Sequence, residues 1–374
     1  MEMLAVTGVG MVSALGEGVV GSCAASRAGI VRILPLDEPR LFDPDTGEGE
    51  LARGHSLPQV TGGFTGLGRL AALAVAGFRD LGRSAQVSDL SRCALYLVAP
   101  NDFHRRLLEE LGLLPEEHET RREVYAKRLV PTVLQLLKVG VPPKLQTVLF
   151  GETGIIDAIR DAAERLRSGL VDRCIIGGLD SLVEPQVAWT LERLGLLKGP
   201  ERPAGVLPGE AAAFAVLELP TAASRRGARI EALIEAPRAA AEPFHRLSRQ
   251  PAMGVALSQC ISDTVEALPD GGREIGLVIG ALNGDVYRAH DWGTALVRLR
   301  ERNLGELRQW YPAQSFGEIG AATALVGLCM AIRGFARGYA KTRGVLVWSA
   351  GDDGSRGAFY VRAPDKQSSE ERRM

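Results

Sequence analysis

One strand–turn–helix–strand unit constrains the fold of this chain more than any other feature of its sequence. Residues 147–150 (TVLF) form a short apolar run that is typical of a buried strand, and 151–154 (GETG) form a turn. A helix is predicted over 155–167, since its apolar side chains recur at helical spacing: Ile155, Ile159, Ala162 and Leu166. A second strand follows at 174–178. The unit predicts an α/β chain, and its turn is the first place to look for chemistry because backbone N–H groups point outward at such junctions.

The same order of elements returns later in the chain. The second set consists of a strand at 275–279, a junction at 281–285, a helix at 320–333, and strands at 345–348 and 359–361. The repeat predicts two related halves, 1–220 and 221–363. The polar, charged segment 364–374 is expected to be a disordered tail.

The glycine-rich loop after the first apolar strand does not fit a dinucleotide site. Residues 8–13 read GVGMVS, so the third glycine of G-x-G-x-x-G is replaced by Ser13, and no acidic residue closes a second strand about twenty residues on. No cofactor is therefore predicted.

Three further segments are expected to lie at the surface. Residues 35–63 are rich in Pro, Gly and acidic side chains and read as a long excursion over the surface. Residues 101–135 are highly charged with a helical period, which predicts a solvated amphipathic helix or a lid. Residues 352–354 (DDG) lie between two apolar runs and predict a hairpin turn.

Charge and cysteine usage exclude several classes of protein. Lys and Arg (44) balance Asp and Glu (45), so nothing in the net charge favours nucleic acid or an anionic membrane as a partner. The start of the chain carries no basic segment, and no run of eighteen apolar residues occurs, so we expect a cytoplasmic protein with no membrane segment. The five cysteines are scattered without a C-x-x-C pair, which predicts neither disulfides nor a metal site.

Four segments, taken in order, resemble the β-ketoacyl synthases of the thiolase superfamily. They are VTGVGMVSALG at 6–16 with SRAGI at 26–30, AIRDAA at 158–163 with the glycines 169, 177 and 178, GEAAAFAVLE at 209–218, and FGEIGAA at 316–322. The resemblance implies a thiolase-like fold, in which two similar halves form a five-layer αβαβα sandwich. It also accounts for the 44 glycines, because central helices packed between two sheets need small residues for close approach.

The catalytic residues of that family are missing from this sequence. Active members use a Cys nucleophile and two His residues, since the chemistry needs a thiolate and donors for developing charge. The alignment places Glu152 at the Cys position, or Gly151 if it is anchored on the following Thr-Gly pair. It places Asn283 at the first His position, or Leu282 after a shift by one, and Glu318 at the second.

Within the family, GETGIIDA at 151–158 most resembles the chain-length factors of type II polyketide synthases, where Gln stands at the Cys position; Glu152 is a departure. The leading hypothesis is a non-condensing partner or scaffold subunit in fatty acid or polyketide type synthesis. The implied partners are a second copy or an active β-ketoacyl synthase, together with an acyl carrier protein.

Two alternatives stay open. In the first, Glu152 and Glu318 face each other as an acid and base pair of an acyl-thioester hydrolase, decarboxylase or acyltransferase. A purely structural interpretation of the same residues has Glu152 capping the helix and Glu318 bonded to Asn283. In the second alternative, the chain is a scaffold outside lipid metabolism.

Overall fold

The computed structural model describes residues 3–42, 45–85, 89–115, 119–246, 248, 250–302 and 304–365. Most of the segment predicted to be a disordered tail, 366–374, lies outside these described residues.

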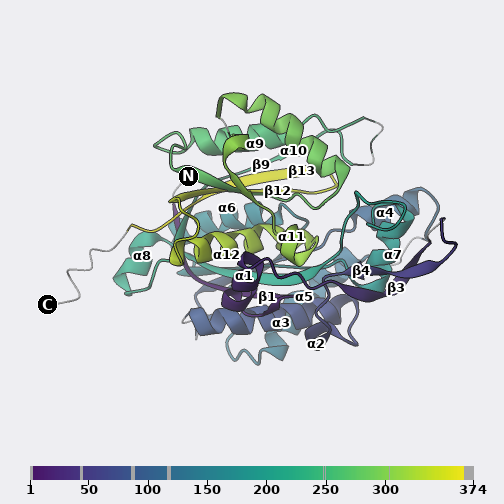
Figure 1. Ribbon diagram of the computed structural model, residues 1–374. Helices are drawn as coiled ribbons and strands as arrows, with labels where there is room; N and C mark the ends of the chain where they lie inside the picture. The colour runs from purple at the N-terminus through teal and green to yellow at the C-terminus, as the bar shows by residue number, and fades with distance from the viewer. Residues whose placement is uncertain are drawn as a thin grey trace.

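Two sets of five strands with the same internal order build the main sheet (Figure 1). The first set comprises β1 (Leu4–Ser13), β5 (Cys93–Ala99), β6 (Leu145–Phe150), β7 (Arg173–Ser181) and β8 (Glu210–Glu218). The second comprises β9 (Ala232–Ala241), β10 (Ile275–Ile279), β11 (Arg308–Trp310), β12 (Gly344–Ala350) and β13 (Ser355–Arg362).

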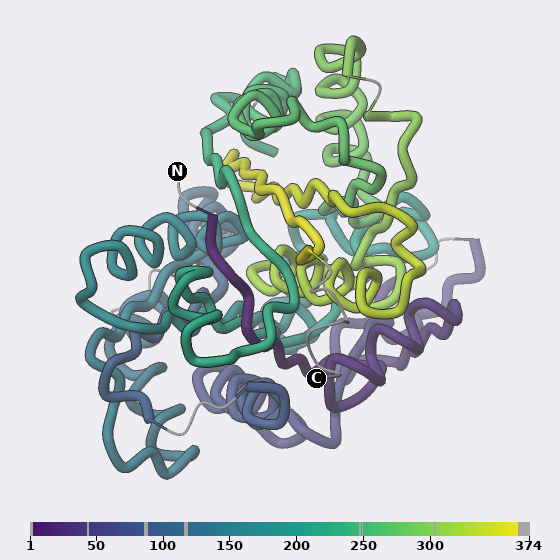
Figure 2. Tube along the Cα trace, turned by 90° about the vertical axis from the view of Figure 1, so that its left-hand side faces the viewer, coloured from purple at the N-terminus to yellow at the C-terminus, as the bar shows by residue number. Residues whose placement is uncertain are grey.

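Both sets follow one topology. The strand order is β6-β5-β7-β8-β1 in the first set and β11-β10-β12-β13-β9 in the second. In each order the first three strands are parallel to one another, and the next two strands are each antiparallel to the strand before them. The sets join where Leu4–Val6 of β1 pairs with Ala232–Ile234 of β9, and Figure 2 shows this purple strand running beside the teal-green one. The repeat predicted from the sequence is therefore present as two sets of strands of equal order.

Five layers result from the way helices cover these strands (Figure 1). The middle layer holds α6 (Gly154–Arg167) and α12 (Thr323–Ala336), each in contact with strands of both sets. The outer layers hold α3 (Gly66–Ser84) and α5 (Arg121–Leu136) on one side, and α9 (Val255–Glu266) and α10 (Val286–Arg298) on the other. The predicted α/β sandwich of five layers is confirmed.

Burial follows from this layering. Strands β1, β5, β8 and β12 are buried along their whole length, as expected for strands covered on both faces. Close approach is visible at Gly178 of β7, where an added Cβ atom would lie 2.7 Å from the carbonyl oxygen of Ala321. A glycine there lets the middle layer touch the sheet.

The remaining elements are short. They are β2 (Gly16–Glu17), α1 (Val19–Arg27), α7 (Pro185–Arg193), α8 (Pro220–Arg225), α11 (Ala313–Phe316) and the 3-10 turns Arg300–Arg302, Leu304–Glu306 and Gly320–Ala322. The predicted boundary at residue 220 falls at the start of α8, between the two sets of strands, and stays a prediction. No helix in the described part of the chain is long and apolar enough to cross a membrane.

Two surface segments differ from the sequence predictions. The segment 35–63 is more regular than expected, because β3 (Leu34–Phe42) and β4 (Gly49–Gly54) pair as an antiparallel hairpin before α2 (Pro58–Thr61). The segment 101–135 contains two helices, since α4 (Phe103–Glu110) ends before α5 begins at a Thr120 capping box. The Pro- and Gly-rich stretch 35–63 resembles a loop in sequence, and the pairing of β3 with β4 makes it regular.

Candidate functional site

The predicted site residues come together where several strands end. Glu152 follows the carboxyl end of β6, and Asn283 follows the carboxyl end of β10. Glu318 lies between α11 and α12. The carboxyl ends of parallel strands are the edge where α/β proteins gather functional side chains, and the structure assembles the three residues there although they are far apart in sequence.

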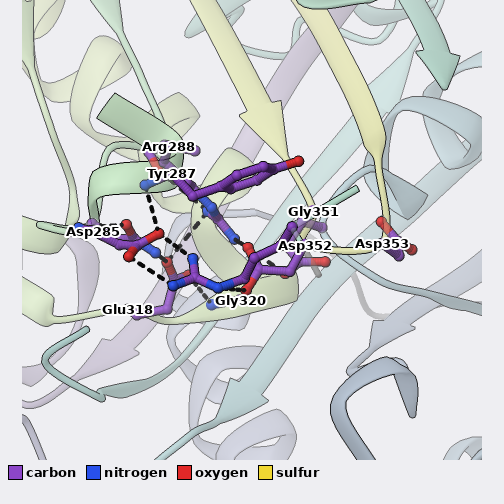
Figure 3. Close-up of polar contacts among 12 residues, drawn as sticks. Asp285, Tyr287, Arg288, Glu318, Gly320, Gly351, Asp352 and Asp353 are labelled. Atoms are coloured by element: carbon purple, nitrogen blue, oxygen red, sulfur yellow. Dashed lines mark hydrogen bonds and ion pairs between the residues drawn. The ribbon is translucent and has the colours of Figure 1, made fainter. Parts of the chain in front are cut away.

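An arginine that the sequence did not indicate occupies the centre of this group. Arg288, on the first turn of α10, is only 3% exposed. Its Nη1 lies 3.3 Å from Oε2 of Glu318, and its Nη2 lies 3.3 Å from Oδ1 of Asp352 (Figure 3). The same Nη2 lies 3.5 Å from Oε1 of Glu152. The guanidinium therefore stands between the two glutamates that were expected to face each other directly.

Asn283 and Glu318 are bonded as the structural interpretation expected. Nδ2 of Asn283 donates to Oε2 of Glu318 at 2.6 Å, and the backbone N–H of Gly320 donates to Oε1 at 2.9 Å. Leu282 instead packs against the apolar cluster around Trp348. Of the two registers left open by the sequence, the one with Asn283 brings a polar side chain into the site.

The junction at 151–154 has only one side chain that reaches the network. Gly151 has φ 80°, and an added Cβ atom would lie 2.9 Å from Nδ2 of Asn101, so a larger residue would be strained there. Ser349 Oγ donates to the backbone carbonyl of Glu152 at 2.8 Å and fixes that residue.

The prediction that Glu152 caps the helix is wrong. The N-cap of α6 is Thr153, and no backbone N–H of this described helix donates to the Glu152 carboxylate. The carboxylate turns toward Arg288 instead, because a buried guanidinium offers a full opposite charge, whereas a helix end offers only partial charges.

Further charged side chains surround the contacts of Arg288. Nε2 of His104, on α4, lies 2.9 Å from Oδ2 of Asp352. Arg246 donates two hydrogen bonds to Asp285, with Nη2 2.7 Å from Oδ1. Asp285 also caps α10 by accepting from the N–H of Tyr287 at 3.2 Å. These pairs hold the helix that carries Arg288 and the β12–β13 turn that carries Asp352.

The network shifts the pKa values of Glu152 and Asp352 in opposite directions. Burial raises the pKa of Glu152 well above the usual carboxyl range, and the neighbouring carboxylates add to this while Arg288 opposes it. Burial also disfavours ionised Asp352, but Arg288, His104 and Arg246 together hold its pKa below the usual range. Burial works against the charge of Arg288, and the three carboxylates nevertheless raise its pKa.

A cavity of about 90 Å³ reaches this network from one side. It borders Glu152 and Gly320, and runs between α4, α5 and α7 past His104, Tyr125 and Asp180. Burial raises the pKa of Asp180 to about 7, although its carboxylate accepts from the N–H groups of Ser181 and Ala321. Asn283, Arg288 and Glu318 do not line this cavity; all three are buried and in contact with one another through Glu318, so their side chains fill the centre of the site.

No thiol lies in this group. All five cysteines lie within the described residues, and each is buried elsewhere: Cys23, Cys93, Cys174, Cys260 and Cys329. Burial raises the pKa of Cys23 and of Cys260 to about 12, which keeps both protonated near neutral pH. Within the described ranges, no group of three or more His, Cys, Asp and Glu is placed to hold a metal ion.

Arg288 and Arg246 were not predicted from the sequence as residues of the site, and Asp352 was predicted only as part of a turn. The hairpin turn predicted at residues 352–354 is confirmed between β12 and β13, but its contact with an arginine was not expected. Nothing in sequence spacing distinguishes Arg288 from the chain's many surface arginines. The one available signal is its position after Asp285, an N-cap residue, which places it on the first turn of a helix.

Comparison with known proteins gives matches among solved structures. No protein-family model matches the sequence, and no curated protein matches it. A type II polyketide synthase ketosynthase solved with its acyl-carrier protein (AntDE:AntF) is 16% identical with a TM-score of 0.73, covering 97% of this chain and 100% of its own. The ishigamide ketosynthase/chain length factor is 20% identical with a TM-score of 0.71, covering 97% and 99%.

A ketosynthase from module 6 of the bacillaene synthase of Bacillus subtilis 168 is 13% identical with a TM-score of 0.74, covering 97% of this chain and 72% of its own. These matches span almost the whole chain, so the predicted thiolase-like fold is confirmed. The chain has the fold of ketosynthases and of a chain length factor.

Proposed function

We propose that this protein is a non-condensing, chain-length-factor-like partner or scaffold subunit of a ketosynthase in fatty acid or polyketide type synthesis. The observation that carries the proposal is the group of Glu152, Asn283 and Glu318 around the buried Arg288. The resemblance in sequence assigns these three residues to the catalytic positions of a ketosynthase. A condensing enzyme needs a thiolate nucleophile and space for a thioester at this point.

The filled centre supports this role over catalysis. Asn283 and Glu318, which the resemblance assigns to the two His positions, are hydrogen-bonded to each other, and the guanidinium of Arg288 contacts both glutamates. An acyl thioester would have to displace a buried ion pair, which costs about 3–5 kcal/mol when one partner is left alone. The retained scaffold and the closed centre together favour a role in assembly.

An unpaired sheet edge offers a surface for that assembly. Strand β6 ends the first set of strands, and it pairs only with β5 within the described chain. Five of its six residues are half-buried and one is exposed, and Leu149 and Phe150 still pack on the core clusters beneath. We propose that this edge pairs with a second copy or with an active ketosynthase, since an exposed edge strand is a template for pairing with another chain.

Intact-protein mass spectrometry tests the central part of the proposal. The purified full chain is incubated with malonyl and acyl thioesters of coenzyme A and of an acyl carrier protein, beside an active ketosynthase as positive control. The expected mass is unchanged for this protein and increased by one acyl group for the control. A stoichiometric acyl adduct on this chain would overturn the non-condensing assignment.

Co-expression tests the partner. A ketosynthase encoded beside this gene should co-purify as a complex of defined stoichiometry, and an acyl carrier protein encoded nearby should bind that complex. If the gene has neither neighbour and the chain binds neither protein, the role is a scaffold outside lipid metabolism.

A second candidate function is hydrolysis, decarboxylation or acyl transfer that uses Glu152 as an acid. Its favouring observation is a carboxyl of raised pKa at the edge of the cavity, which is a common property of catalytic acids. Under this candidate, Glu152→Gln and Glu318→Gln each abolish turnover of acyl thioesters, measured as thiol release. Turnover that both variants retain would exclude these residues as its acid and base.

A further inference from the structure

A second pocket, distinct from the filled centre, lies between α1, α12 and the segment that follows β11. Its volume is about 160 Å³. It is lined by Cys23, Ser26, Arg27, Trp310, Tyr311, Gln314, Ser315, Met330 and Tyr339. None of these residues belongs to the charge network around Arg288, so the pocket needs its own explanation.

Aromatic side chains are concentrated in this pocket. The chain has only 6 Tyr and 4 Trp in 374 residues, yet Trp310, Tyr311 and Tyr339 all line this one space. The ring centroids of Trp310 and Tyr339 are 5.7 Å apart at an interplanar angle of 40°. Tilted ring faces at the edge of a pocket form a surface on which another planar ring can stack.

Positive charge surrounds the same rings. The guanidinium of Arg27 lies over the Tyr339 ring, 5.6 Å from its centroid. Arg333 and Arg337 act on Tyr339 together with Arg27, and all three favour its ionised form, although burial still raises its pKa to about 12. Of these three arginines, Arg27 is the one that lines the pocket, so its guanidinium is the group that would pair with a negative charge next to Tyr339.

No carboxylate is among the described residues that line the pocket. Asp80, which acts on Cys23, lies outside the lining, and its carboxylate accepts hydrogen bonds from the N–H groups of Met11 and Val19. Arg27 is thus the one charged side chain among the described lining residues, and it has no carboxylate partner within that lining.

Polar groups close the other side of the pocket. The hydroxyls of Ser26 and Ser315 are 2.9 Å apart and hydrogen-bonded, which ties α1 to α11. Gln314 beside them is exposed and offers an amide donor and acceptor. This polar lining is unsuited to an alkyl chain, and the arginines disfavour a cation.

We propose that this pocket binds a planar aromatic anion, with its ring against Tyr339 and Trp310 and its negative group beside Arg27. The volume is close to the ~150 Å³ of a cavity that holds one benzene, so the pocket can enclose one ring of such an anion, and the exposed side chains of Arg27 and Gln314 mark the side on which it opens to solvent. The site goes beyond the proposed partner role, because it lies outside the centre on which that role rests.

The test uses the full-length protein and 2-naphthoate as the probe, a planar bicyclic carboxylate. Two matched compounds separate the requirements: 2-naphthamide keeps the ring without the charge, and cyclohexanecarboxylate keeps the charge without the aromatic ring. Isothermal titration calorimetry should give saturable binding of 2-naphthoate at one site, at least about tenfold tighter than either analogue, and weakened by added salt. Quenching of Trp310 fluorescence, lost in Trp310→Phe, should report the same Kd.

Two substitutions in the lining test whether 2-naphthoate binds in this pocket. Arg27→Gln and Tyr339→Leu should each weaken 2-naphthoate binding at least about fivefold. The control is Arg193→Gln, since Arg193 also lies over an aromatic ring, Trp189 at 4.8 Å, but outside this pocket. Arg27 and Arg193 are both exposed, so neither change threatens folding. No saturable binding, equal binding of the neutral amide, or binding unchanged in Arg27→Gln would overturn the proposal.

Discussion

At the scale of single residues, the central question is how Arg288 balances the charges around it. Three carboxylates, those of Glu152, Glu318 and Asp352, lie within 3.5 Å of one guanidinium. Asp352 has further partners in His104 and Arg246, which with Arg288 lower its pKa, whereas burial and the neighbouring carboxylates raise the pKa of Glu152. The raised pKa of Glu152 favours its neutral form, which reduces the excess of negative charge around Arg288.

Arg288→Met should destabilise the protein by about 3–5 kcal/mol at pH 7, because it leaves buried carboxylates without a partner. Urea unfolding followed by circular dichroism measures the loss. The control is Arg302→Met, since Arg302 pairs with the exposed Glu266 and a surface pair contributes about 0–1 kcal/mol. Equal small losses in both variants would contradict the central role of Arg288.

Replacing the two shifted carboxyls should change the pH dependence of stability in opposite senses. The folded-state pKa of Asp352 is lowered, so its ionised form stabilises the fold above the unfolded pKa of about 3.9, and this stability is lost as pH falls. Asp352→Asn should therefore cost stability at pH 7. This cost should begin to shrink only below about pH 4 and should still be present in part near pH 3, because the folded-state pKa lies well below the usual range.

The folded-state pKa of Glu152 is raised, so the protein loses stability as pH rises from about 4.3 through that pKa. Glu152→Gln should remove this decline, so the variant should be no less stable than the unchanged protein at pH 8. Each unit by which the folded-state pKa exceeds the unfolded pKa destabilises the unchanged protein by about 1.4 kcal/mol at high pH. Melting curves from pH 3 to pH 8 measure both effects. A Glu152→Gln variant that loses stability at pH 8 would mean that the ionised form is the stabilising one.

At the scale of elements, glycines set how closely helices and strands approach. Gly10 of β1 faces α3, and an added Cβ atom would lie 2.2 Å from the backbone nitrogen of Leu81. Gly82, on the same helix, has nothing within 4 Å of its added Cβ atom. The two positions look alike in sequence, and only packing separates them.

Gly10→Ala should destabilise the protein by about 1–3 kcal/mol or more, because the backbones of β1 and α3 would have to separate. Gly82→Ala should stabilise it by about 0.5–1 kcal/mol, because alanine limits the freedom of the unfolded chain and favours the helix. Thermal unfolding of the two variants measures both changes in stability. Changes of the same sign would show that the close contact between β1 and α3 does not limit residue 10.

At the scale of the whole molecule, two strand sets of equal order form one sandwich, and β6 remains at its outer edge. A copy that pairs there would extend the sheet without changing the site, because the network around Arg288 is built by one chain. A second copy can therefore pair at β6 while the side chains around Arg288 stay packed.

The full chain should elute as a dimer of about twice 40.0 kDa in size-exclusion chromatography with light scattering, alone or with its partner. Gln146→Lys on the exposed part of β6 should shift the homodimer toward monomer, since a lysine on each copy would bring like charges together at an edge pairing. Gln259→Lys on the exposed face of α9 is the control with the same charge change. A dimer unaffected by Gln146→Lys would place the interface elsewhere.

Local periodicity and short ordered motifs in the sequence predict the order of strands and helices and the repeat. The positions Glu152, Asn283 and Glu318 came from the family resemblance, with Gly151 and Leu282 as alternatives for the first two. The hydrogen bond between Asn283 and Glu318, which the structural interpretation of these residues expected, is present.

The charged residue that joins the two glutamates could not be predicted from the sequence. Arg288, Arg246 and Asp352 come from separate elements, and no sequence spacing records that they meet in one buried group. The same holds for the direction of Glu152, which faces Arg288 and not the end of α6. Local periodicity fixes which residues form an element, whereas the partner of a buried charge depends on burial and on elements packed from elsewhere in the chain.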